Sequence, residues 1–151
     1  LEWLWRIKEE PKLWRRYWDD GIGLLTLLVD RVIPLARMQR RVPLLPARFE
    51  AATMLVDEGE GECILTLAGV VGTANVSRLR ALLPIAARST KPLVLDCTGL
   101  EEIDSAALAS LMLLYGACRA AGRPWAVLGV NVELRKQFEL YCAAYLLQPV
   151  A

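Results

Sequence analysis

The most informative stretch of this chain runs from Leu93 to Ser105 and reads LVLDCTGLEEIDS. It opens with an unbroken apolar run, typical of a buried parallel strand, which ends at Asp96. We predict a turn at Thr98-Gly99 and then a long helix with Asp104 or Ser105 at its N-cap. The Ser105 hydroxyl would lie near unpaired backbone N–H groups, where a phosphate meets the positive end of the helix dipole. An ordinary capped helix explains the same residues.

The residues around this stretch alternate between strand and helix patterns. Two segments rich in β-branched residues, 49–57 and 62–70, flank a Gly-rich turn and predict a hairpin. Asn75 is a suitable N-cap for a helix that Pro84 should kink or shorten. Further elements follow as strands at 92–96 and 125–129 and as helices at 105–121 and from 131. The fold class is therefore α/β, a mixed sheet covered by helices.

The residues from Asp96 to Leu108 also carry a family pattern. A strand ending in D-x-[ST]-x-[LV]-x-x-[IM]-D-S, followed by a helix of small and apolar residues, resembles the STAS domain (sulfate transporter and anti-sigma factor antagonist). The resemblance covers roughly Phe49 to Leu147 and implies the SpoIIAA-like fold. It also implies that Ser105 is the residue that a partner kinase phosphorylates.

Two departures from the anti-sigma factor antagonists bear on function. Ala107 stands where those proteins usually have glycine, and Gly69 to Thr73 lacks the acidic residue that they carry after the second strand. The chain is thus nearer to the divergent STAS-like modules that are attached to other proteins.

Composition divides the chain into parts. Residues 1–48 hold ten Lys and Arg against six Asp and Glu, a formal charge of +4, whereas residues 49–151 carry −3. Four of the five tryptophans lie in the first 18 residues. We predict a helical tail at 1–41, a linker at 42–48 and the STAS-like domain at 49–151.

The tail reads as short amphipathic helices. We predict one over Leu1–Lys8, a second that begins at Pro11, and a third over Leu24–Ile33 that stops near Pro34. Trp and Arg mixed on such helices suit the surface of a membrane, and packing on a further N-terminal domain explains them equally well. The candidate contacts with lipid or diphosphate are Trp14, Arg15, Arg16 and Trp18.

The tail has its own resemblance. The runs Leu1–Arg6 and Glu10–Tyr17 are similar to the C-terminal end of the WecB/TagA/CpsF family of bacterial glycosyltransferases. That family transfers sugars onto lipid-linked acceptors in polysaccharide biosynthesis. The resemblance implies that a transferase domain precedes this segment and that Arg15 and Arg16 face a diphosphate or anionic lipid.

The chain offers little for catalysis of its own. It has no histidine, which removes Ser-His-Asp and Cys-His catalysis and the commonest zinc ligand, and it has no nucleotide-binding motif. We therefore expect no enzyme activity, cofactor or metal in this fragment, and no binding of nucleic acid. The four cysteines lie in apolar patterns without C-x-x-C spacing, so we expect them to be buried free thiols. Free thiols indicate a cytoplasmic protein. If the tail binds lipid, we expect it to lie at the inner face of the plasma membrane.

Three functions stay open. The chain is a STAS module that regulates the transferase to which it is fused, or a phospho-switch on a kinase and an anti-sigma factor, or a sensor of a nucleotide or lipid-linked sugar. The apolar tail also allows a homo-oligomer. The candidate binding residues, at the carboxyl ends of the predicted strands, are Asp96, Thr98, Asp104 and Ser105.

Overall fold

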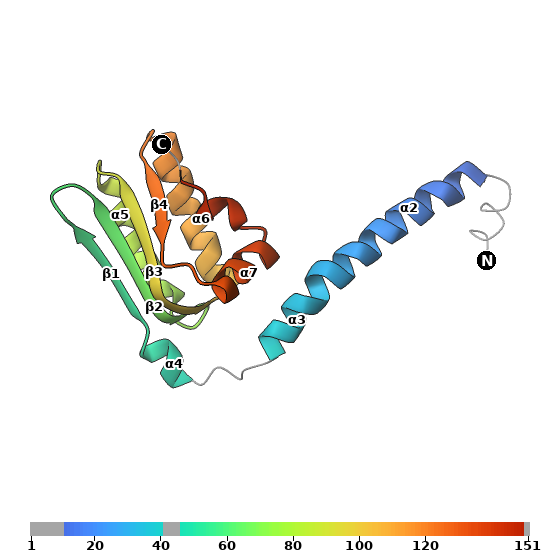
Figure 1. The fold of residues 1–151 in the computed structure, drawn as a ribbon, viewed down its shortest axis with the longest axis horizontal. Helices are drawn as coiled ribbons and strands as arrows, with labels where there is room; N and C mark the ends of the chain where they lie inside the picture. The colour runs from blue at the N-terminus through green and yellow to red at the C-terminus, as the bar shows by residue number, and fades with distance from the viewer. Residues whose placement is uncertain (1–10, 41–45, 150–151) are drawn as a thin grey trace. The chain divides into compact units, whose positions relative to one another are not determined.

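The computed structural model describes residues 11–40 and 46–149, and the chain forms two compact units, Leu1–Pro43 and Leu44–Ala151. The second unit contains a four-stranded sheet in the order β1-β2-β3-β4 (Figure 1). β1 is antiparallel to β2, and the other neighbours are parallel. The predicted hairpin and mixed sheet are confirmed. The strands are β1 (Thr53–Glu58), β2 (Cys63–Val71), β3 (Leu93–Ile103) and β4 (Trp125–Leu128).

Helices cover one face of this sheet. α5 contacts β1 and β2, α6 contacts β3 and β4, and α7 lies against β3. Alternate strand residues that face these helices, such as Leu65, Leu95 and Trp125, are almost fully buried, whereas Leu55 and Leu128 on the other face are exposed. The elements of this unit beyond the strands are α4 (Pro46–Glu50), α5 (Val76–Arg88), α6 (Ser105–Ala120), α7 (Val132–Leu140) and the short 3₁₀ helix η2 (Ala144–Leu147).

The central strand β3 is longer than the sequence predicts. The turn expected at Thr98-Gly99 is wrong, because β3 continues to Ile103 beside β2. Two irregularities in the pairing with β2 take up extra residues of β3, one between Asp96 and Gly99 and one between Leu100 and Glu102. Bulges of this kind let polar residues and glycine lie inside a strand, and in the sequence alone these residues resemble a turn.

The start of the domain also differs from the prediction. Phe49, expected in the first strand, lies in α4, and so do Pro46 to Arg48, which were predicted as linker. Pro46 fits the first turn of a helix because its missing N–H has no partner there. The Arg48 guanidinium also forms an exposed ion pair with Glu101 on β3, at 2.8 Å.

The first unit is one helical run instead of separate helices. α2 (Pro11–Leu27) begins at Pro11 as predicted and continues through a π turn, η1 (Leu28–Val32), into α3 (Ile33–Arg40). The predicted stop near Pro34 is wrong. Proline has no N–H and its ring crowds the carbonyl four residues earlier, and the wider π turn just before it accommodates the ring. The helix predicted over Leu1–Lys8 lies outside the described residues.

The cysteines are not all buried. Cys63, Cys97 and Cys118 lie in the core, as predicted, but Cys142, just after α7, is exposed. Burial raises the pKa of the Cys97 thiol to about 12 and also raises the pKa of Cys118. Since the thiolate is the reactive form, Cys97 and Cys118 are protected both because reagents cannot reach them and because their thiols stay protonated.

We expect a thiol reagent to label the native chain quickly at Cys142 and to reach the other three cysteines only as the chain unfolds. Labelling at neutral pH, followed by mass spectrometry, should show one fast modification, and Cys142→Ser should abolish it. Fast labelling of Cys97 in the native chain would contradict the burial of β3.

Candidate functional site

The N-terminal end of α6 is built around the carboxylate of Asp104. Asp104 is the N-cap: its Oδ1 accepts hydrogen bonds from the backbone N–H groups of Ala106 and Ala107, at 2.9 and 3.0 Å. Its Oδ2 accepts from the N–H and the hydroxyl of Thr73, at 2.5 and 2.8 Å. One side chain therefore caps α6 and also fastens the loop between β2 and α5.

That loop approaches Asp104 closely enough to require glycine. A Cβ atom at Gly72 would lie 2.6 Å from Oδ2 of Asp104 and 2.8 Å from its Cγ. Asn75 completes the loop, because its Oδ1 accepts from the N–H of Gly72, while its amide donates to the carbonyls of Phe49 and Val70. Asn75 thus holds the predicted N-cap position of α5, but its side chain braces the loop instead of capping the helix.

α7 supports the same end of β3 from another side. The side-chain oxygen of Gln137, a residue that is 6% exposed, accepts from the N–H of Ile103 at 2.9 Å. Sequence reasoning missed Gly72, Thr73 and Gln137. Gly72-Thr73 directly after a strand signals a loop, but no local pattern shows that this loop meets Asp104.

Ser105 is the first residue of α6 and is exposed. The predicted surroundings of its hydroxyl need correction, because the N–H groups of Ala106 and Ala107 are already bonded to Asp104. A phosphate on Ser105 would therefore lie beside a carboxylate whose two oxygens are both in use. The positive end of the helix dipole would remain its local source of attraction.

Asp96 and Thr98 form a second, separate cluster. The N–H and the hydroxyl of Thr98 donate to Oδ1 of Asp96 at 2.9 and 2.6 Å, and these bonds, led by the hydroxyl, lower the pKa of Asp96. Gly129, just after β4, has a positive φ of 72° and passes so close to Thr98 that a Cβ would collide with it. The cluster therefore lies where β4 ends.

The four candidate residues do not form one site. Seven residues of β3 lie between Asp96 and Asp104, so the two are up to about 26 Å apart at roughly 3.3 Å per residue of strand. The structure joins Asp96 to Thr98 midway along β3, and it places Asp104 and Ser105 just after the end of that strand.

The structure describes little of the predicted lipid or diphosphate contacts in the tail. Trp14, Arg15 and Arg16 lie in α2, but their side chains are outside what the structure describes, and Trp18 is exposed. Over the described ranges, no helix is long and apolar enough to cross a membrane, and no three His, Cys, Asp or Glu residues cluster as metal ligands.

Two surface grooves lie elsewhere on the domain. An apolar groove of about 370 Å³ runs between α5 and α6, and a second of about 250 Å³ lies between α4 and α5. Neither is lined by Asp96, Thr98, Asp104 or Ser105. The grooves therefore do not support a ligand at the predicted sensing residues.

With this geometry, the chain can be compared with known proteins. The sequence matches the family model described as "Mlab, STAS domain" over residues 54–148, so the chain belongs to the STAS domain family. The match does not reach the helical tail, where the transferase resemblance stays a prediction. No curated protein matches the chain.

Solved structures are similar to this chain. An anti-sigma factor antagonist from Mycobacterium paratuberculosis is 18% identical with a TM-score of 0.56, and the similarity covers 65% of this chain and 84% of that chain. The anti-sigma factor antagonist SpoIIAA in its unphosphorylated form is 16% identical with a TM-score of 0.49, over 58% of this chain and 82% of that chain. The predicted SpoIIAA-like α/β fold is confirmed.

We expect Gly72→Ala to destabilise the domain by about 1–3 kcal/mol, because the added methyl group must displace Asp104 from its four hydrogen bonds. Gly116→Ala, within α6, is the matched control. Its Cβ would meet nothing within 4 Å, so it should stabilise by roughly 0.5–1 kcal/mol. Urea unfolding of both variants measures the difference, and equal effects would contradict the close approach at Gly72.

We expect Thr98→Val to lower the melting temperature near neutral pH and to matter less in acid. The lowered pKa of Asp96 means that this carboxylate stabilises the fold above its unfolded pKa of about 3.9, and that this contribution disappears as pH falls through the folded value. Melting curves at about pH 7 and about pH 3 test the sign, with the exposed Thr53→Val as control. A deficit that grows in acid would refute the assigned cause.

Proposed function

We propose that this STAS domain is a non-catalytic module that binds a protein partner at the N-terminal end of α6. The observation that carries the proposal is the exposed Ser105 next to a carboxylate, Asp104, fixed by four hydrogen bonds. A surface held in one geometry binds without the cost of ordering it. Ser105 follows Asp104 in the chain, Thr73 donates to the Asp104 carboxylate, and both are exposed, so a partner can reach both.

We further propose that phosphorylation of Ser105 controls this binding. A phosphate adds about −1.5 to −2 charges at neutral pH. Since Asp104 already occupies the nearest N–H groups, the new charge has few local donors and remains available to the partner. A kinase would phosphorylate Ser105, and the added charge would change how tightly the regulated partner, an anti-sigma factor or a fused enzyme, binds.

The regulated partner that the sequence favours is a glycosyltransferase domain of the same polypeptide. This part of the proposal rests on the resemblance of Leu1–Arg6 and Glu10–Tyr17 to the C-terminal end of the WecB/TagA/CpsF family. The coding sequence upstream of Leu1 tests it directly. A transferase reading frame there supports the fusion, and an unrelated domain there removes it.

We expect Ser105→Asp to abolish or strongly weaken capture of the partner by the purified chain from a lysate of its host, while Ser105→Ala keeps it. Thr90→Asp is the matched control, because Thr90 is exposed in the loop before the other end of β3. Asp near a helix start is tolerated, so the melting temperature should change little. Loss of capture by Thr90→Asp as well would point to net charge and not to the site.

Intact mass measurement of the chain from its native host tests the modification itself. A single added phosphate that fragmentation assigns to Ser105 supports the switch. A phosphate on another residue, or none across growth conditions, would refute it and leave the binding surface to be tested by the Ser105 variants.

A further inference from the structure

The outer side of α6 is apolar, although it faces solvent. One side of this helix packs on β3 and β4, and its exposed residues include Ala109, Leu113 and Ala117. A surface helix usually has a polar outer side, and a helix that is apolar all round is usually covered. Leu113 is 75% exposed, and it lines the apolar groove of about 370 Å³ between α5 and α6, here called the α5–α6 groove.

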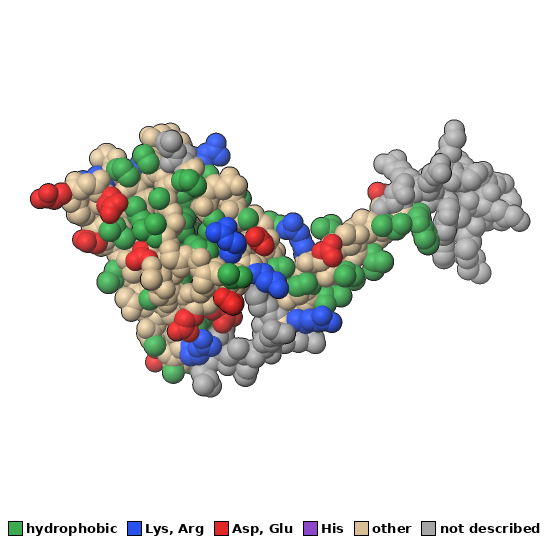
Figure 2. Space-filling view, viewed as in Figure 1, with side chains coloured by type: hydrophobic (Ala, Val, Ile, Leu, Met, Phe, Trp, Pro, Cys, Tyr) green, Lys and Arg blue, Asp and Glu red, His purple; other side chains and the backbone are tan. Residues whose placement is uncertain are grey.

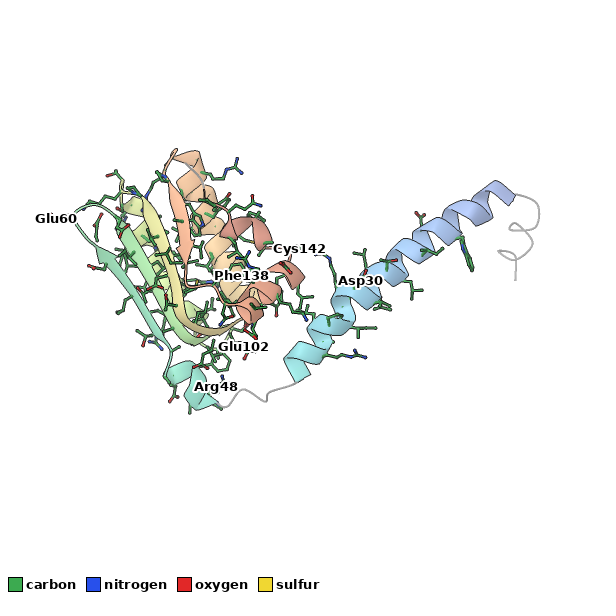
Figure 3. All side chains as sticks on the ribbon, viewed as in Figure 1. Asp30, Arg48, Glu60, Glu102, Phe138 and Cys142 are labelled. Atoms are coloured by element: carbon green, nitrogen blue, oxygen red, sulfur yellow. The ribbon has the colours of Figure 1, made fainter. Side chains whose placement is uncertain are left out.

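The charges of these two helices are all positive. α5 and α6 contain four arginines and no Asp or Glu, although residues 49–151 hold eight Lys and Arg against eleven Asp and Glu. The acidic side chains gather elsewhere on the domain. Figure 2 shows them over the hairpin of β1 and β2, and Figure 3 labels Glu60 in its turn and Glu102 on β3. The α5–α6 groove therefore favours an occupant that carries negative charge.

Arg80 supplies the positive charge in the lining of the groove. Its Nε donates to the hydroxyl of Ser110 at 3.3 Å, and that hydroxyl donates to the carbonyl of Ala106 at 2.9 Å. Within the described part of the chain, the two terminal nitrogens of Arg80 form no hydrogen bond or ion pair. A guanidinium held in this way can bind a carboxylate through two parallel hydrogen bonds.

The groove also leads toward Ser105. Along α6, Ser105, Ala109, Leu113 and Ala117 follow one another at intervals of four residues, so they lie along one side of the helix. All four are exposed, and the last three line the groove. This line is about 18 Å long at 1.5 Å per residue, which roughly three turns of a partner helix can follow.

We propose that the α5–α6 groove binds an acidic amphipathic helix of a partner protein. Apolar side chains of that helix enter the groove, and one of its carboxylates pairs with Arg80. A second copy of the domain placed face to face would bring arginines together, and a flat lipid surface has no side chains to fill a hollow. Control of this contact rests on the proposed function: a phosphate on Ser105, at the end of the same line, repels the acidic helix.

The probes are two fluorescent peptides of about 16 residues, long enough to form a helix in the groove. Both carry Leu at intervals of three and four residues, and the flanking positions are Glu in one peptide and Lys in the other. By fluorescence anisotropy, the Glu peptide should bind the full 151-residue chain at least about tenfold more tightly than the Lys peptide. Arg80→Glu should reverse this order. Arg135→Glu, the same charge change on an exposed residue of α7, is the control and should keep it.

Leu113→Gln tests the apolar part of the contact. It should weaken binding of the Glu peptide about tenfold, because the leucine side chain loses its burial in the complex. Leu128→Gln, at an exposed leucine on the other face of the sheet, is the matched control and should leave binding unchanged. Ser105→Asp should weaken binding of the Glu peptide about three- to fivefold, and Ser105→Ala should not.

Three results would overturn the groove as the binding site. Neither peptide binds at about 1 mM, both bind equally, or the Glu peptide binds Arg80→Glu and Leu113→Gln as tightly as the wild type. Equal binding of the peptides, together with sedimentation of the wild type but not of Leu113→Gln on phosphatidylglycerol vesicles, would assign this face to lipid instead. If the contrasts at Arg80 and Leu113 hold while Ser105→Asp changes nothing, the groove stands and its control by Ser105 is refuted. The capture experiment with the Ser105 variants tests the proposed function separately, since it does not use these peptides.

Discussion

The hydrogen bonds of the Asp104 carboxylate are the constraint on which the functional end of the domain depends. β3 ends beside β2, α6 begins at once, and the loop from β2 to α5 must meet both. One carboxylate meets these requirements, because one oxygen caps α6 and the other binds Thr73. The arrangement needs a glycine at position 72 and the bracing amide of Asn75. The local chain is thus fixed before any partner arrives.

This constraint also decides how a charge at Ser105 can act. In many helices a phosphate at the first turn gains the free N–H groups and stabilises the helix. Here two of those groups are committed to Asp104, so the phosphate either competes with the cap or projects toward solvent. Competition would displace the Asp104 carboxylate, whose other oxygen holds Thr73 and its loop, and projection would present two adjacent negative groups. In both cases phosphorylation changes the surface of the domain and not its core.

Much of the domain could be predicted from local pattern, and the failures share a cause. The hairpin, α6 and the last strand and helix follow from periodicity, the Gly-rich turn and capping residues, which are local signals. β3 beyond Asp96 was missed because its bulges exist only through pairing with β2. Arg123 was missed for a related reason: it is 5% exposed and donates to carbonyls of Ala86 and Lys91, which lie far from it in sequence. The candidate site was half predicted, since Asp104 and Ser105 are adjacent in sequence, whereas Thr73 and Gly72 reach them only in the fold.

The helical first unit shows the same dependence on contacts beyond the local chain. Gly21 and Gly23 lie inside α2, and Pro34 lies near the start of α3. Each lowers helix propensity, and most of the stability of helices in proteins comes from packing an apolar face. Few of the described side chains in this unit are even half-buried, and those lie near Pro34. Burial of the exposed apolar side chains of this helix, such as Leu24 and Leu25, would stabilise it, so we expect the segment to be most helical when its apolar side is covered.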